Sequence, residues 1–284
     1  MNSSIYLEQA KRAALEAGAI LKEKLGKVGF REKSPADLVT EADVASQRRI
    51  EEILLTAFPE HYFLGEESQG ATPSFGANFT GSTSEKKMLK ESECGSKAPS
   101  NLPYTWIVDP LDGTTNFVHG VPFFCTSIAL ARGNELLCGV IHDPNSGELF
   151  TAERGQGAYL NGVRLQTSSV LRPANALTTI SFPTETKLDS PDYLAFTRCL
   201  PVCQAMRRTG STALNLAYVA CGRFDGAVCQ CAHPWDVAAG VLLILEAGGV
   251  VTHPDGRAFD LAVHPILATA NSELHRGFLT LLND

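Results

Sequence analysis

The segment from Trp106 to Phe117 constrains the fold of this chain more than any other part of the sequence. It reads Trp-Ile-Val-Asp-Pro-Leu-Asp-Gly-Thr-Thr-Asn-Phe, an apolar run that ends in two carboxylates and breaks into glycine and threonines. This pattern predicts a buried strand that turns into the start of a helix. Because carboxylates attract cations and a helix start exposes backbone amides, the segment can hold both a cation and a phosphate.

The two carboxylates, Asp109 and Asp112, lie three residues apart across Pro110. A hard divalent cation such as Mg²⁺ prefers oxygen ligands, typically one or two carboxylates completed by waters and a substrate phosphate. We therefore expect both side chains to reach one pocket, with the Leu111 carbonyl as a further ligand. The alternative is a surface Asp-Gly turn, with Asp109 as a helix cap.

The residues after Asp112 favour a phosphate. Gly113 and Thr114 open the next element, where free amides and the positive end of a helix dipole attract an anion. Thr114 adds a hydroxyl, although a threonine at this position is equally explained as an ordinary helix cap.

Two further acidic motifs stand at predicted element ends. Gly65-Glu66-Glu67-Ser68 ends the apolar run 61–64, and Trp235-Asp236 opens a strongly apolar helix. A solvated loop would also explain the glutamates, and a favourable interaction with the helix dipole would explain Asp236. Each acid alone is therefore ambiguous.

Hydrophobic periodicity gives the organisation of the rest of the chain. Amphipathic helices are predicted at 5–25 and 41–58, the second with Thr40 and Asp43 as a capping box. Residues 69–103 are predicted to be a long loop or partly ordered insert. Strands are expected near 105–108, 123–131, 135–142, 177–182, 204–207, 225–228 and 266–270, and helices near 190–199, 211–221, 235–247 and 272–282. Strands first and alternation later predict a layered α+β or α/β fold.

Composition excludes several classes of protein. The 284 residues suit one large domain or two intimately packed ones, and the net charge of -7 argues against nucleic-acid binding. The longest apolar run, 237–245, is about half of the roughly 20 residues of a membrane-spanning helix. The start of the chain lacks the features of a secretory signal, and the eight cysteines include no Cys-x-x-Cys pair. We expect a cytoplasmic protein with free thiols and no membrane contact.

Three motifs together carry a resemblance: Gly65-Glu66-Glu67-Ser68, the 106–117 segment, and Pro234-Trp235-Asp236-Val-Ala-Ala-Gly240. In this order they resemble the inositol monophosphatase family of Mg²⁺-dependent, lithium-sensitive phosphatases, and the similarity runs from the first helix to Ala270-Asn271. The resemblance implies a layered α/β/α/β/α sandwich of the sugar-phosphatase type and a homodimer. It also implies a single domain over 1–284, with a metal-binding part at about 1–175 and a C-terminal α/β part at about 176–284.

The resemblance also implies roles for individual residues. The ligands of two or three Mg²⁺ ions would be Glu66, Asp109, Asp112, Asp236 and the Leu111 carbonyl. Glu66 and Thr114 would orient the attacking water, with Asp43 bonded to Thr114, and the Gly113 and Thr114 amides would hold the phosphate. Lys33-Ser34-Pro35 corresponds to a mobile loop that closes on the site.

The substrate side is less well defined. It resembles the family at Gly210 to Asn215, which includes Ser211 and Thr212. A family glutamate that binds an inositol hydroxyl falls, by spacing, on Cys229, and a thiol is a poor replacement for a carboxylate acceptor. Arg208 could meet a second phosphate, or Arg207 and Arg208 could be a solvated pair.

We therefore predict a phosphatase of a small phosphate monoester, with inositol monophosphate as the leading substrate. Fructose-1,6-bisphosphate, histidinol phosphate, 3′-nucleotides and NADP are alternatives in the same superfamily. A different class, a non-catalytic protein-binding member, would be favoured by loss of a metal carboxylate. All four are present.

Overall fold

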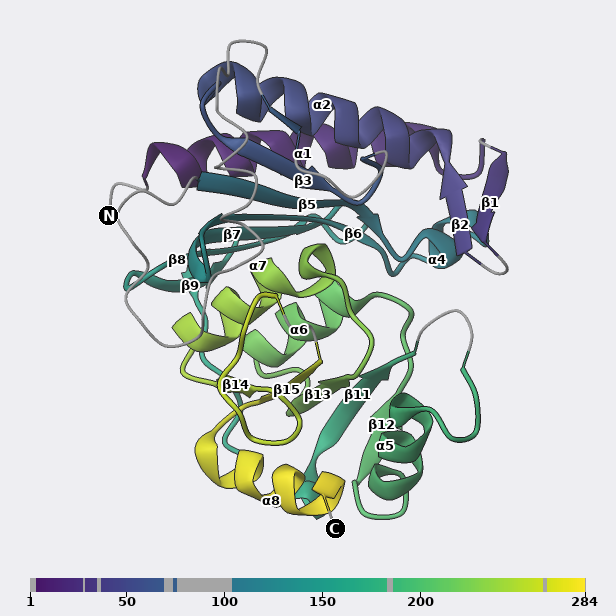
Figure 1. Cartoon of the computed structure of the whole chain (residues 1–284), viewed down its shortest axis with the longest axis vertical. Helices are drawn as coiled ribbons and strands as arrows, with labels where there is room; N and C mark the ends of the chain where they lie inside the picture. The colour runs from purple at the N-terminus through teal and green to yellow at the C-terminus, as the bar shows by residue number, and fades with distance from the viewer. Residues whose placement is uncertain are drawn as a thin grey trace.

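The computed structural model describes residues 4–27, 29–34, 37–68, 74–75, 104–182, 186–262 and 265–283. Across these residues, helices and sheets alternate in five layers from the top of Figure 1 to the bottom: helices, sheet, helices, sheet, helices. The predicted α/β/α/β/α sandwich is therefore confirmed.

Two N-terminal helices form the first layer, α1 (Ile5–Lys24) and α2 (Glu41–Ala57). The inward face of α1 consists largely of alanines, which allow close approach to α2 and to the sheet below. Thr40 caps α2 as predicted: its hydroxyl accepts from the Ala42 amide, and the Asp43 carboxylate accepts from the Thr40 amide at 2.8 Å. The hairpin of β1 (Phe30–Ser34) and β2 (Asp37–Thr40) leads into this cap.

The first sheet has eight strands in the order β10-β9-β8-β7-β6-β5-β3-β4. Its members are β3 (Tyr62–Gly65), β4 (Ser74–Phe75), β5 (Tyr104–Asp112), β6 (Cys125–Arg132), β7 (Glu135–Asp143), β8 (Glu148–Glu153), β9 (Gly157–Leu160) and β10 (Val163–Arg164). All neighbours are antiparallel except β3 and β5, which run parallel. The short helix α4 (Thr114–Val118) follows β5 directly.

The second sheet has five strands in the order β12-β11-β13-β15-β14. They are β11 (Leu177–Ser181), β12 (Ala205–Arg207), β13 (Gly226–Cys229), β14 (Val250–Thr252) and β15 (Ile266–Thr269), preceded by the 3₁₀ turn η1 (Pro173–Asn175). Helices α6 (Thr212–Ala220) and α7 (Pro234–Glu246) lie between the two sheets, and α5 (Pro191–Cys199) and α8 (Ser272–Asn283) cover the outer face of the second (Figure 1).

The middle layer is the centre of the core. Helix α7 is apolar nearly all round, with Val237 to Ile244 buried, and one hydrophobic cluster joins it to α6 and to both sheets. A helix that is hydrophobic on all sides needs partners on all sides. Gly240 makes this possible because a Cβ there would lie 2.4 Å from the Leu216 side chain. We propose on this basis that the chain forms one domain.

Most predicted elements exist, with shifted ends. Strand β5 continues past residue 108 to include both acids, and the strand predicted at 123–131 begins only at Cys125. Sequence periodicity missed the short strands β1, β9, β10 and β14. Within the predicted insert 69–103, Ser74–Phe75 pairs with β3, and the rest lies outside the described residues.

Two expectations from the sequence concern the cysteines and membrane-spanning helices. The cysteines that the structure describes are all free, and Cys94 lies outside the described residues. None of the helices in the described ranges combines the length and the apolarity that crossing a membrane requires.

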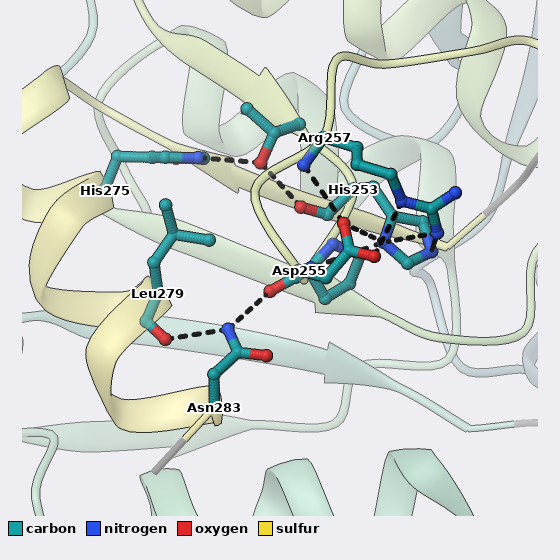
Figure 2. A network of polar contacts seen from close by, with 8 residues as sticks. His253, Asp255, Arg257, His275, Leu279 and Asn283 are labelled. Carbon is teal, nitrogen blue, oxygen red and sulfur yellow. Dashed lines mark hydrogen bonds and ion pairs between the residues drawn. The ribbon is translucent and has the colours of Figure 1, made fainter.

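A network of polar contacts joins His275 of α8 to the end of β14 and the turn that follows it (Figure 2). The Thr252 hydroxyl donates to the His253 carbonyl at 2.7 Å, so it must accept from His275 Nε2, which lies 2.9 Å away. His275 Nδ1 lies 2.8 Å from the Thr269 hydroxyl, which can donate either to this nitrogen or to the Asn271 carbonyl at 3.3 Å. Burial lowers the pKa of His275 below its ordinary value of 6.5, which favours the neutral ring.

This arrangement predicts a loss of stability in mild acid. In the unfolded chain, His275 takes up a proton near its ordinary pKa of 6.5, whereas the folded protein resists protonation. The unfolded state then binds more protons, so stability falls as pH drops through 6.5, by up to about 1 kcal/mol per pH unit. Urea unfolding at pH 7.5, 6.5 and 5.5 should show a smaller loss for His275→Gln than for wild type. Identical pH dependence of the two proteins would contradict this assignment.

Candidate active site

A cavity of about 540 Å³ opens where β5, α4 and the starts of α6 and α7 meet. It brings together most of the predicted site residues: Glu66, Asp109, Leu111, Asp112, Gly113, Thr114, Arg208, Thr212 and Asp236. Asp43, Ser211 and Cys229 are buried outside its lining. For the Lys33 to Pro35 loop, the structure describes only the backbone of residues 33 and 34, in β1.

A β-bulge explains how Asp109 and Asp112 reach the same cavity. Side chains of a strand alternate between its faces, so residues three apart should point to opposite sides. Opposite β6, however, Asp109 pairs with Ser127 and Asp112 with Cys125, so three steps on β5 match two on β6. Pro110 suits the bulge because it has no N–H to place in the ladder, and the Thr126 hydroxyl satisfies its carbonyl at 3.1 Å. The extra residue reverses the alternation.

Parallel pairing of β3 with β5 brings Glu66 beside Asp109. Gly65 pairs with Val108, and the Glu66 amide continues the ladder to the Val108 carbonyl at 3.0 Å. Gln47 of α2 supports this turn, because its Oε1 accepts from the Glu67 amide at 2.8 Å.

Asp112 is bound to the start of α6. Its Oδ2 accepts from the Ser211 hydroxyl at 2.5 Å and from the Ala213 amide at 2.6 Å, and its Oδ1 accepts from the Thr212 amide at 3.3 Å. A carboxylate at this end of a helix also interacts favourably with the dipole. Ser211 therefore acts on Asp112 and does not line the cavity.

Asp236 is the third residue of α7 and belongs to its N-terminal cap. Its Oδ2 accepts from the His233 amide at 2.7 Å. The ring of His233 stacks on that of Trp235 with 4.7 Å between centroids, and both rings line the cavity.

Thr114 and Asp43 are in contact, as the family resemblance implies. The Thr114 hydroxyl lies 3.1 Å from Asp43 Oδ1 and 3.0 Å from the Leu111 carbonyl, and it can donate to only one of them at a time. Asp43 is held in place by the Thr40 hydroxyl and amide on its other oxygen. Gly113 takes a left-handed φ of 95° at the start of α4, a conformation that favours glycine.

The acids raise one another's pKa. Burial, followed by the charges of Glu66, Asp112 and Asp236, raises the pKa of Asp109 well above 3.8. Burial also raises the pKa of Asp112 to about 6, although its bonds to Ser211 and the α6 amides oppose the shift. For Asp236, the pKa is raised by loss of water around the carboxylate and then by the charge of Asp112. Like charges in a poorly solvated cavity produce this pattern.

The donor set fits a hard divalent cation. Carboxylate oxygens and a main-chain carbonyl are the ligands such ions prefer, and a cation would relieve the mutual repulsion. Among the residues that the structure describes, no three Asp, Glu, His or Cys side chains lie close enough together, in their observed conformations, to hold a metal ion. Asp112 and Asp236 are turned toward helix amides, so gathering the carboxylates around an ion requires these side chains to move.

The prediction for Cys229 needs correction. Cys229 ends β13, a strand with neighbours on both sides, and only 2% of the residue is exposed. The chain leaves the sheet after it, and Cys231, Ala232 and His233 line the cavity. The spacing from Asp236 therefore identifies the correct segment, but the cavity-lining cysteine is Cys231, two residues after Cys229. Burial beside Asp192 raises the pKa of the Cys231 thiol to about 11.

Sequence reasoning also missed Asn116 and Ser181, which both line the cavity. The Asn116 side-chain amide donates to the Phe123 carbonyl at 2.7 Å and to the Thr209 carbonyl at 2.9 Å, so it ties α4 to the loop before α6. Asn116 lies inside the 106–117 motif, which was the available signal. A serine at a strand end, such as Ser181, gives no such signal.

Known proteins resemble this chain in sequence and in structure. The model of the inositol monophosphatase family matches residues 3–284. Inositol monophosphatase 2 of Solanum lycopersicum is 39% identical over 283 residues, or 98% of each chain. The fructose-1,6-bisphosphatase/inositol-1-monophosphatase of Aquifex aeolicus is 36% identical over 255 residues, covering 88% of this chain and 86% of that protein. The crystal structure of the extragenic suppressor protein suhB from Bartonella henselae superposes with a TM-score of 0.84 at 33% identity, covering 99% of each chain.

The family match and the names of the relatives define a phosphoric monoester hydrolase. The chain belongs to the inositol monophosphatase family.

Crowding of the acids predicts that removing one charge stabilises the metal-free protein. Asp109→Asn keeps an Oδ1 acceptor for the Leu111 amide, which donates to it at 3.0 Å, and removes the charge that repels its neighbours. In a chelator at pH 7.5, a gain of about 1 kcal/mol should raise the melting temperature by about 2–4 °C. Near pH 4 the gain should shrink, because Asp109 is then protonated in the folded protein and already about half protonated in the unfolded chain. Calorimetry that finds an unchanged or lower melting temperature at pH 7.5 would contradict this account.

Proposed function

We propose that this protein hydrolyses a small phosphate monoester, with inositol monophosphate as the leading substrate, by attack of a water molecule in the presence of Mg²⁺. The observation that carries the proposal is the shared cavity, in which Glu66, Asp109, Asp112 and Asp236 meet the Gly113 and Thr114 backbone. The names of the related proteins support inositol monophosphate as the substrate.

Two or three Mg²⁺ ions would be held by the carboxylates of Glu66, Asp109, Asp112 and Asp236 and by the Leu111 carbonyl. Bound there, they would supply a water of lowered pKa and neutralise charge on the phosphate oxygens. Glu66, which follows β3 on the cavity wall, would orient that water.

Thr114 and Asp43 would position the attacking water through hydrogen bonds. When the Thr114 hydroxyl donates to Asp43 Oδ1, 3.1 Å away, its oxygen lone pairs are free to accept from the attacking water. Asp43 thus fixes the orientation of Thr114 from outside the cavity. The amides of Gly113 and Thr114, at the start of α4, bind the phosphate oxygens.

A bisphosphorylated sugar such as fructose-1,6-bisphosphate is the second candidate. Arg208 lines the cavity and places a permanent cation near the carboxylates, where a second phosphate could pair with it. The relative from Aquifex aeolicus carries both activities in its name.

We propose in addition that the enzyme is cytoplasmic, lithium-sensitive and homodimeric. The free thiols are consistent with a reducing compartment. Lithium sensitivity and dimerisation rest on the family resemblance.

A phosphate-release assay tests the proposed function. With Mg²⁺, wild type should release phosphate from inositol-1-phosphate, and a chelator should abolish the release. Glu66→Gln should lower kcat/KM by about 100-fold or more, because it removes a charged ligand and the water's orienting group. Glu67→Gln changes the neighbouring carboxylate, which does not line the cavity, and serves as the matched control. Undiminished activity after rigorous metal removal, or equal losses of activity in Glu66→Gln and Glu67→Gln, would contradict the proposal.

Arg208 separates the two candidate substrates. If a second phosphate pairs with its guanidinium, Arg208→Met should lower kcat/KM for fructose-1,6-bisphosphate by about tenfold or more and leave inositol-1-phosphate within about twofold. Equal effects on both substrates would show that Arg208 does not select between them.

A further inference from the structure

Asp192 is a buried carboxylate that the proposed chemistry does not use. It stands in the first turn of α5, which covers the outer face of the second sheet, and its exposed fraction is 0% (Figure 1). The dipole of α5 favours an acid in this turn but does not require its burial. In the described part of the chain, Asp192 Oδ2 is buried without a hydrogen-bond partner. Because such an oxygen destabilises a fold, packing alone gives no reason for an acid here.

The other oxygen of Asp192 binds the chain where it leaves β13. Asp192 Oδ1 accepts from the Gln230 amide at 3.1 Å. Strand β13 ends one residue earlier, at Cys229. The carboxylate therefore accepts the first amide beyond the strand and holds the direction in which the chain continues.

The thiols on either side of Gln230 also lie near Asp192. Burial, and then the Asp192 carboxylate, raises the pKa of the Cys231 thiol to about 11. Burial, followed by the charges of Asp236 and Asp192, raises the pKa of the Cys229 thiol well above its ordinary value. Asp192 thus faces three consecutive residues, 229 to 231, from the side of α5.

This segment reaches the proposed active site in two ways. Cys231, Ala232 and His233 line the cavity. The His233 amide then donates to Asp236 Oδ2 at 2.7 Å. A displacement of the chain after β13 would therefore move both the cavity wall and the contact that holds a proposed metal ligand.

We propose that Asp192 is a positioning residue that fixes the segment from Gln230 to His233 and, through it, the cavity wall and Asp236. The inference rests on the proposed phosphatase function and deepens it. Asp192 does not line the cavity, so it acts through the Gln230 amide and touches no substrate. This role explains why an acid with a partnerless oxygen stands in the interior.

Two substitutions test the role in activity. Asp192→Leu removes the acceptor, whereas Asp192→Asn keeps an Oδ1 acceptor for the Gln230 amide. Asp192→Leu should lower kcat/KM for inositol-1-phosphate about tenfold, mainly through KM, and raise the Mg²⁺ concentration for half-maximal activity, because the wall and Asp236 lose their fixed positions. Asp192→Asn should stay within about threefold of wild type. Asp189→Leu changes an exposed acid just before α5 and serves as the matched control.

Amide hydrogen exchange measures the anchor without any turnover. In chelated wild type the Gln230 amide should be protected. It should exchange about tenfold faster or more in Asp192→Leu and keep most of its protection in Asp192→Asn. The melting temperature of Asp192→Leu should stay within about 2 °C of wild type, because removal of a buried carboxylate with a partnerless oxygen offsets the lost hydrogen bond.

The outcomes distinguish this inference from the proposed function. Rapid exchange of the Gln230 amide in wild type would overturn the role of Asp192 even if no variant folded. Unchanged kcat/KM in Asp192→Leu, or an equal loss in Asp192→Asn, would also overturn it. A fall in melting temperature with faster exchange throughout α5 would show a role in folding only and overturn it too. A wild type that releases no phosphate overturns the proposed function, and amide exchange then still decides whether Asp192 anchors the segment.

Discussion

The hydrogen bonds from Asp112 to the start of α6 are the interaction on which the rest of the site depends. They tie β5 of the first sheet to a helix that lies between the two sheets. This attachment holds Gly210 and Thr212 at the cavity wall. Asn116 reinforces it from the other side by binding the Thr209 carbonyl. The sandwich thus builds its cavity from elements that are far apart in the sequence.

This attachment places mutually repelling carboxylates in a region poor in water. The raised pKa values of Asp109 and Asp236 show that the metal-free fold is destabilised there. Compensation comes from the apolar middle layer, where α7 is buried between the sheets. A cation that relieves this repulsion would bind the folded state selectively and stabilise it, once the side chains of Asp112 and Asp236 have moved toward it.

The sequence predicts the regular elements well. Helices α1, α2 and α5 to α8 lie within one or two residues of their predicted ends, because cap residues such as Thr40, Ser190 and Ser211 mark where helices begin. Short strands such as β9 and β10 carry too few residues to show a period. The bulge at Pro110 is also invisible to periodicity, since regular alternation would send Asp109 and Asp112 to opposite faces.

For the candidate site, the sequence motifs predict the acidic residues but not most of the other residues that line the cavity. Glu66, Asp109, Asp112 and Asp236 share a cavity because each stands at an element end that the fold brings to the same place. Ser181 ends β11 and Cys231 follows β13, and only tertiary packing makes them neighbours of the acids. The misplacement at Cys229 has the same origin, since spacing does not reveal where a strand leaves its sheet.

The central claim is that the carboxylate cavity is a cation site, and thermal unfolding of wild type during Mg²⁺ titration tests it most directly. Starting from chelated protein at pH 7.5 and constant ionic strength, the melting temperature should rise progressively with the logarithm of Mg²⁺ concentration once the ion exceeds its dissociation constant. A monovalent salt at matched ionic strength should not reproduce the rise. A melting temperature that is independent of Mg²⁺ up to the concentrations that support hydrolysis would contradict the account.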